Sequence, residues 1–161
     1  MSIRKSGDYA EERFVAAVHG SWYSTDPSAG DVVMYHNGRD RYVEIKSTSG
    51  RQASQVRPIK WIPLVVLHKP TNIWHVLSAP EQVNMACYRS RGQHTELPWE
   101  CCQLSLPFPV QCRDAGLPDA IARAFDEGDD DLERYEAMRI LSQRLGELRH
   151  EVKERIARRI V

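Results

Sequence analysis

Three ionisable side chains, Asp31, Glu44 and Lys46, have the types and spacing for metal-dependent chemistry. Asn37-Gly38 lies between them and favours a two-residue β-turn, because both residues tolerate positive φ. In such a hairpin the numbers of paired residues add up to 75, so Asp31 faces Glu44, and Lys46 lies on the same side as Glu44. Facing side chains have Cβ atoms about 4.5–5.5 Å apart, so both carboxylates could bind one cation. A one-residue shift of the register would separate them.

Apolar residues on both sides of this hairpin predict that the charged residues are partly buried. One side carries Val32, Met34, Val43 and Ile45, and the side of the carboxylates carries Val33, Tyr35 and Tyr42. Two neighbouring carboxylates in a partly dry environment repel each other, so a proton, a cationic side chain or a bound metal ion must offset the repulsion. A surface hairpin with its charges facing water is the alternative.

The same residues resemble a known nuclease superfamily. Asp31 followed by Glu44-Ile45-Lys46 is similar to the D…ExK core of the PD-(D/E)xK nucleases, and Gly7-x-x-x-Glu11 resembles their N-terminal helix motif. One departure is that a glycine, where the superfamily has proline, precedes Asp31.

Archaeal-type Holliday-junction resolvases share more of this order. Gln55-Val56-Arg57 resembles their QVR segment, and apolar strands over 63–67 and 74–77 follow it, as in those enzymes. The resemblance covers the chain to about residue 77. It implies a restriction-endonuclease-like α/β fold, in which helices flank a mixed central sheet.

The resemblance also implies a site for Mg²⁺, with Mn²⁺ as a substitute. Asp31, Glu44 and the Ile45 carbonyl would bind the ion, because hard oxygen ligands select a hard cation. Lys46 would orient the attacking water or stabilise the charge that develops on the phosphate. Glu11 would serve a second ion, or hold the first ion through water.

Two of the candidate residues have an equally plausible structural explanation. Glu11 lies at the margin of the apolar stripe of a predicted helix over 5–19, whereas Glu12 points nearly opposite the stripe. An ordinary solvated acid explains Glu11 as well. The resemblance implies that Gln55 positions water or the backbone. Gln55 lies in a predicted helical turn that Pro58 limits, and a polar residue in a basic connector needs no functional role.

The formal net charge is zero, which counts mildly against a nucleic-acid enzyme. Basic and hydroxylated residues nevertheless surround the hairpin and its exit. We predict DNA contacts for Arg41, Ser47, Ser49, Arg51, Arg57 and Lys60. Acidic residues gather over 126–131, so the sequence predicts that charge is segregated, with the positive part beside the site.

The remaining elements follow from apolar periodicity. Short strands are predicted over 21–25, 64–67, 73–77 and 99–106, with the middle two at the centre of the sheet, and Pro80 suits the start of a helix running to about residue 89. The polar segment 89–96 could contact DNA, form a second patch through His94 and Glu96, or be a solvated loop.

Prolines and Gly116 divide the chain into a nuclease-like core over 1–110 and a helical extension over 111–161. Helices are predicted over 119–125 and 132–161, and the second has a narrow apolar stripe with heptad-like spacing. This stripe predicts either a homodimer seam or packing against the core.

These features together predict a divalent-metal-dependent DNA endonuclease, acting on four-way junctions or, as a type II restriction enzyme would, on linear duplex. An inactive DNA-binding or scaffold protein is the alternative of another class, and RNA stays open as a substrate. No long apolar run or C-x-x-C pair is present, so we expect a cytoplasmic protein with no membrane segment and no zinc site.

Overall fold

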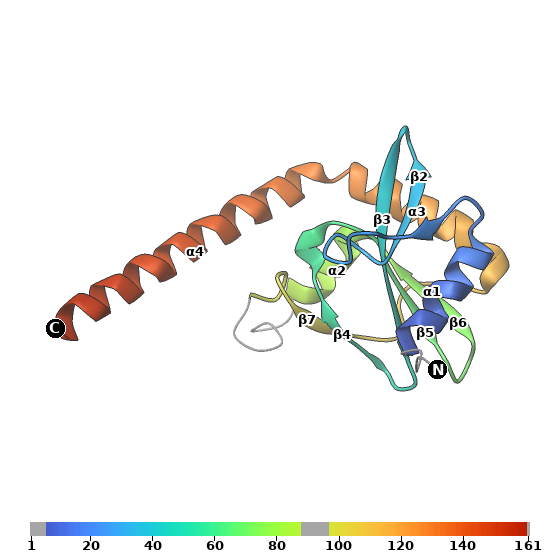
Figure 1. Cartoon of the computed structure of the whole chain (residues 1–161), viewed down its shortest axis with the longest axis horizontal. Helices are drawn as coiled ribbons and strands as arrows, with labels where there is room; N and C mark the ends of the chain where they lie inside the picture. The colour runs from blue at the N-terminus through green and yellow to red at the C-terminus, as the bar shows by residue number, and fades with distance from the viewer. Residues whose placement is uncertain (1–5, 88–96, 161) are drawn as a thin grey trace. The chain divides into compact units, whose positions relative to one another are not determined.

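The computed structural model describes residues 6–87 and 97–160 (Figure 1), so the predicted segment 89–96 lies outside the described residues. The strands are β1 (Trp22–Tyr23), β2 (Val32–His36), β3 (Arg39–Thr48), β4 (Gln52–Val56), β5 (Leu64–His68), β6 (Ile73–Leu77), β7 (Cys102–Ser105) and β8 (Val110–Cys112). The helices are α1 (Ser6–Ala17), α2 (Ala79–Cys87), α3 (Leu117–Asp129) and α4 (Leu132–Ile160), with short 3₁₀ turns η1 (Pro58–Lys60) and η2 (Asp114–Gly116). No described helix has the length and apolar character needed to cross a membrane.

Six strands form a mixed sheet in the order β1-β2-β3-β5-β6-β8. Among the described strands of this sheet, β3 and β5 pair in parallel, and the other neighbouring strands pair antiparallel. The predicted class, an α/β fold with a mixed sheet flanked by helices and a C-terminal helix, is confirmed. The strand predicted over 99–106 corresponds to β7, but β7 pairs with β4 in a separate two-stranded ribbon, and β8 was not predicted.

The β2–β3 hairpin has the predicted turn and register. Asn37 and Gly38 have φ angles of 49° and 83°, as a two-residue turn with two left-handed positions requires. His36 pairs with Arg39, and Val32 pairs with Val43, so paired numbers add up to 75. The turn chemistry and the strand pattern therefore agree.

Two apolar cores cover the two faces of the sheet. The first core lies between the sheet and helices α1 and α3, and it includes Phe14, Val43 and Phe125. The second core lies between the sheet, α2 and the β4–β7 ribbon, and it includes Leu64 and Val66. The predicted stripe of α1 faces the first core. Both faces of the central strands are thus buried, as expected for a sheet with helices on both sides.

The first compact unit runs to residue 130, whereas the sequence placed a boundary at 110. The difference arises because α3 is longer than predicted and packs on the sheet through Leu117, Ile121 and Phe125. α4 forms the second unit by itself, over the predicted length.

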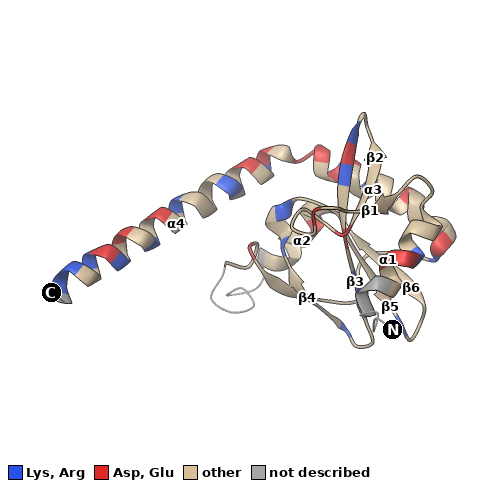
Figure 2. Ribbon diagram, viewed as in Figure 1, with Lys and Arg blue, Asp and Glu red and all other residues tan. Residues whose placement is uncertain are grey.

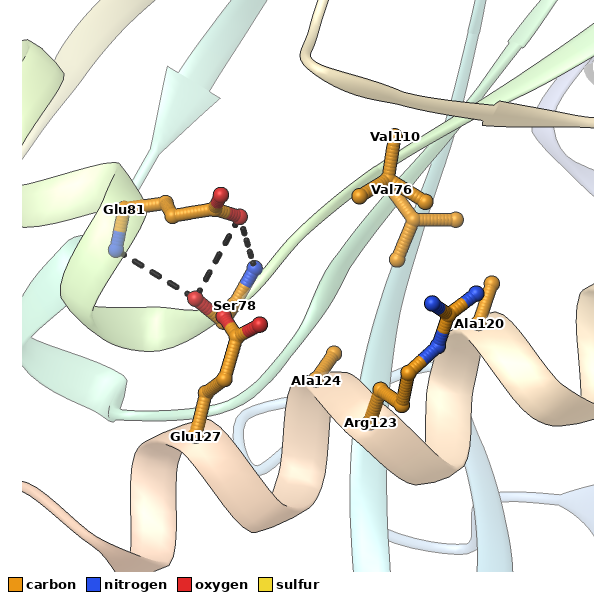
Figure 3. Close-up of a pocket in the computed structure, with 8 residues that line it drawn as sticks. All are labelled: Val76, Ser78, Glu81, Val110, Ala120, Arg123, Ala124 and Glu127. Carbon is orange, nitrogen blue, oxygen red and sulfur yellow. Dashed lines mark hydrogen bonds between the residues drawn. The ribbon is translucent and has the colours of Figure 1, made fainter.

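Helix α2 begins with a capping box (Figure 3). The Ser78 backbone N–H donates to Glu81 Oε2 at 3.1 Å, and the Glu81 N–H donates to Ser78 Oγ at 3.4 Å. The two residues satisfy backbone donors at the helix start that have no partner inside the helix. Pro80 in the first turn agrees with the predicted helix start.

Candidate active site

Asp31 is held beside Glu44 by a hydrogen bond that extends the sheet. β2 begins at Val32, so the Ile45 N–H of β3 has no backbone partner on that side. Asp31 Oδ2 accepts this N–H at 2.8 Å, and the Asp31 N–H donates to the Val43 carbonyl at 3.0 Å. The carboxylate thus replaces a strand residue and is fixed next to the residue that follows Glu44.

The glycine before Asp31 is explained by close packing. Gly30 is buried, and a Cβ at this position would lie 2.8 Å from Tyr42 Cβ and 3.3 Å from the Val43 carbonyl oxygen. Any residue with a Cβ, proline included, would clash with β3. The departure from the superfamily pattern therefore follows from how the loop enters the hairpin, and it leaves the carboxylate of Asp31 in place.

Glu44 lies between two lysines. Lys46 Nζ is 3.6 Å from Glu44 Oε1, and Lys60 Nζ is 3.4 Å from Glu44 Oε2. All three side chains are about one-fifth exposed. In the parallel register Glu44 pairs with Leu64 and Lys46 with Val66, so both charged side chains lie on the face of the second core.

The electrostatics of Asp31 differ from those of an ordinary surface acid. Burial and the neighbouring charge of Glu44 raise the pKa of Asp31 above its usual value of 3.8, although the Ile45 hydrogen bond and the charges of Lys46 and Lys60 oppose the shift. Burial disfavours the charged form, and the second carboxylate adds repulsion. The ionised form of Asp31 is therefore destabilised, which is the condition that a bound cation would relieve.

The sequence analysis did not place Lys60 at the candidate site. The sequence assigned it only to DNA contact, but its charge acts on Asp26, Asp31 and Glu44. η1 fixes its position, because Pro58 is buried and Trp61 donates from Nε1 to the Gly128 carbonyl at 2.9 Å. The signal in the sequence was weak: one lysine between a proline and a tryptophan.

The donor set fits Mg²⁺ better than a cation that demands many protein ligands. Over residues 6–87 and 97–160, no three His, Cys, Asp or Glu side chains form a cluster that could hold a metal ion. Mg²⁺ is commonly bound by one or two carboxylates, with water and substrate phosphates completing its shell. Asp31 and Glu44 match that demand, and the Ile45 carbonyl stays a predicted third ligand.

Glu11 and Gln55 are less well supported as site residues. Glu11 is half-buried on α1, and it does not complete a three-carboxylate cluster with Asp31 and Glu44. Gln55 does not start a helical turn as predicted. It lies in strand β4, in an irregular stretch between Ala53 and Val56, with a φ of 54° and an exposed side chain. Its catalytic role stays a prediction.

Two predicted DNA-contacting residues lie on the other face of the sheet. Arg41 donates to both carboxylate oxygens of Asp129, at 2.7 and 2.9 Å, and its guanidinium stacks over Phe125 in the first core. Ser47 pairs with Leu67 of the first core, so its side chain points away from Glu44 and Lys46. Side chains alternate between the two faces along a strand, and both residues are three positions from Glu44, so they belong to the opposite face. The prediction of DNA contacts from charge overlooked this signal.

The predicted segregation of charge is wrong at the hairpin turn (Figure 2). The acids of α3 neutralise this end: Asp126 Oδ1 lies 2.8 Å from His36 Nε2, and Asp129 pairs with Arg41 and Arg39. The positive charge near the candidate site is therefore smaller than the sequence suggested. It consists chiefly of Lys46 and Lys60.

The other predicted contacts lie along the exit from β3. Ser49, Arg51 and Arg57 are all exposed, and Arg51 also lines a cavity of about 380 Å³ with His68 and His75. The sequence predicted that the face with the carboxylates is covered along the hairpin. Tyr35 is 65% exposed, so this face is open to solvent near the turn. That face is covered at Val33, which is buried.

No protein-family model and no curated protein matches the sequence. Among solved structures, the chain is similar to a bacterial homing endonuclease, I-Ssp6803I, with 13% sequence identity and a TM-score of 0.45. The match covers 81% of this chain and 98% of that chain.

Proposed function

We propose that the protein is a divalent-metal-dependent DNA endonuclease of the PD-(D/E)xK type. The observation that carries the proposal is the pair of Asp31 and Glu44, with Lys46 at 3.6 Å from Glu44 and with the pKa of Asp31 raised. Carboxylates whose pKa is raised by burial and by a second carboxylate cluster at functional sites.

Asp31 and Glu44 would hold Mg²⁺, with the Ile45 carbonyl as a further ligand. When bound, the ion would acidify a coordinated water and stabilise negative charge on the scissile phosphate. The hydrogen bond from Ile45 N–H leaves Asp31 Oδ1 for the ion and fixes the plane of the carboxylate. This arrangement holds one ligand rigidly before the substrate arrives.

The two lysines would take different parts in the reaction. Lys46, on the same strand as Glu44, would donate to the attacking water or to a non-bridging phosphate oxygen, where negative charge develops. Lys60, held by η1, would contact an adjacent phosphate of the bound strand. Both ammonium groups now pair with Glu44, and in a complex with DNA they would donate to phosphate oxygens instead.

The substrate is proposed to be DNA, and branched DNA in particular. The order of motifs resembles that of junction resolvases, and Ser49, Arg51 and Arg57 provide exposed donors along the exit from β3. Phosphate contacts of this kind position a nucleic acid without reading its sequence. A type II restriction enzyme acting on linear duplex is the second candidate, because it uses the same core.

Cleavage assays test the proposal directly. The purified chain with Mg²⁺ should cut a four-way junction faster than a linear duplex of the same sequence, and EDTA should stop the reaction. Equal rates on both substrates would favour the restriction-enzyme alternative. Asp31→Ala and Glu44→Ala proteins that cut like the parent would refute the assignment of the site.

An inactive DNA-binding protein predicts a different result. Calorimetry of the parent with Mg²⁺ or Mn²⁺ should give stoichiometric binding that Glu44→Ala abolishes, because that variant lacks one of two carboxylate ligands. DNA binding without any metal binding would favour the inactive alternative. It would also leave the raised pKa of Asp31 without a function.

A further inference from the structure

Helix α4 carries a continuous apolar seam that its own unit does not cover. The helix spans Leu132–Ile160, about 43 Å at 1.5 Å per residue. Leu141, Leu148 and Val152 are each about half exposed, at 46%, 55% and 47%, and Leu145 lies between them. Their spacing of four, three and four residues is that of a coiled-coil heptad, with residues 145 and 152 at a and residues 141 and 148 at d.

We infer that this seam binds a second copy of the chain, with the two α4 helices antiparallel. In antiparallel pairs, an a residue of one helix faces a d residue of the other. A two-fold axis between residues 146 and 147 then gives two kinds of layer, Leu145 with the partner's Leu148 and Leu141 with the partner's Val152. Each layer occurs twice, so four consecutive apolar layers form an isologous interface.

The charges beside the seam decide between the two directions. In the antiparallel arrangement, Arg144 at g faces the partner's Glu151 at g, and the two-fold axis repeats this attraction. In a parallel pair, Arg144 would face the partner's Arg149 at e, and Arg155 would face its own copy in the seam. Like charges at such positions destabilise the pair, so the sequence of α4 favours the antiparallel direction.

The charges within α4 leave this pair available. The ion pairs along the helix join Asp131 with Arg134, Glu136 with Arg139, and Glu154 with His150 and Arg158. Arg144 and Glu151 belong to none of these pairs. At the ends of the antiparallel seam Arg159 faces the partner's Arg134, where long side chains can turn into solvent.

Charge reversal gives opposite signs for the two directions. Sedimentation equilibrium of the full chain, without metal or DNA, should give a dimer whose dissociation constant rises about ten-fold in Arg144→Glu, because two attractions become repulsions. In a parallel dimer the same change would tighten association, because it would place an acid opposite Arg149. The double variant Arg144→Glu/Glu151→Arg should return to within about two-fold of the parent.

Lys153→Glu is the matched control, since it makes the same change in charge at an exposed position away from the seam. It should leave the dissociation constant within about two-fold, and circular dichroism should show unchanged helix content in every variant. A monomer at the highest soluble concentration, an unchanged constant in Arg144→Glu, or tighter association would overturn the inference. The result does not depend on cleavage, so it is separate from the proposed function.

Discussion

The two ends of the β2–β3 hairpin use the same kinds of charged residue with opposite outcomes. At the turn end, hydrogen bonds from His36 and Arg41 lower the pKa values of Asp126 and Asp129, respectively. At the open end, burial and Glu44 raise the pKa of Asp31. A lowered carboxylate pKa means that the fold stabilises the charge, and a raised one means that the fold bears a cost. The fold therefore stabilises the charges at the turn end, whereas it leaves an unfavourable charge at the open end, as the proposed metal site would require.

Removing the lysine on β3 should produce the largest effect. Lys46→Met should lower the cleavage rate by about 10²–10³-fold, because a donor aimed at developing charge is lost, while DNA affinity stays within a few-fold. Rates at saturating DNA, together with binding isotherms, check this. Lys69→Met, an exposed lysine at the β5–β6 turn, is the control and should retain full activity. An equal loss of cleavage in both variants would show that Lys46 at the open end acts no differently from an ordinary surface lysine.

At the turn end, the expected loss is one of stability. Arg41→Met should lower the free energy of unfolding by about 2 kcal/mol, because Arg41 is only 11% exposed and its loss leaves Asp129 without its bidentate partner. Arg39→Met, at 62% exposure and 3.6 Å from Asp129, should cost less than about 0.5 kcal/mol. Urea unfolding measures both. Cleavage per folded molecule should be unchanged, and a selective loss of cleavage by Arg41→Met would return Arg41 to the DNA-contacting set.

Neutralising one acid at each end should shift the melting temperature in opposite directions. Asp31→Asn keeps an oxygen for the Ile45 N–H but removes the repelled charge, so the metal-free variant should melt about 2–4 °C higher than the metal-free parent. The variant should also fail to bind Mg²⁺. Asp126→Asn should melt lower, because His36 and Asn37 lose a charged acceptor. Calorimetric scans in EDTA check both, and shifts of the same sign would undo the comparison.

Acidification should abolish metal binding before it weakens the turn end. The raised pKa of Asp31 means that protonation, which competes with the cation, begins above the usual range near pH 3.8. The lowered pKa values of Asp126 and Asp129 mean that their contribution to stability is present above that range and is lost only as pH falls through the lowered values. Mn²⁺ titrations and unfolding curves at a series of pH values should show this order. The reverse order would contradict the assignment.

The smallest expected effect concerns Lys60. Lys60→Met should strengthen Mg²⁺ binding about three-fold, because a cation that competes for Glu44 is removed, and should weaken DNA binding by a similar factor. Calorimetry and binding isotherms at fixed salt measure the two constants. Weaker binding of both ligands would show that Lys60 supports the shape of the site instead of competing within it.

The hairpin that carries the candidate site could be predicted because its geometry is local. Asn37-Gly38 specifies the turn, and the turn specifies the register of residues 32–36 on residues 39–43. Asp31 lies one residue before this ladder, where its N–H donates to the Val43 carbonyl and its carboxylate accepts the Ile45 N–H. The apolar stripe of α1 and the strands β5 and β6 were equally readable, because their periodicity reports which side is buried. Gln55 was misread as a helical turn because the pairing of β4 with β7, distant in the chain, overrides local preference.

By itself, the sequence determined the turn and the register of the hairpin, since a two-residue turn leaves one register. Only the tertiary structure decided which charges are neutralised. Asp129 reaches Arg41, and Lys60 reaches Glu44, because α3 and η1 pack against a sheet formed from distant segments. Coulomb energy depends on distance in space and on burial, and neither follows from position along the chain. The hairpin could therefore be predicted from residue types, whereas the difference between its two ends could not.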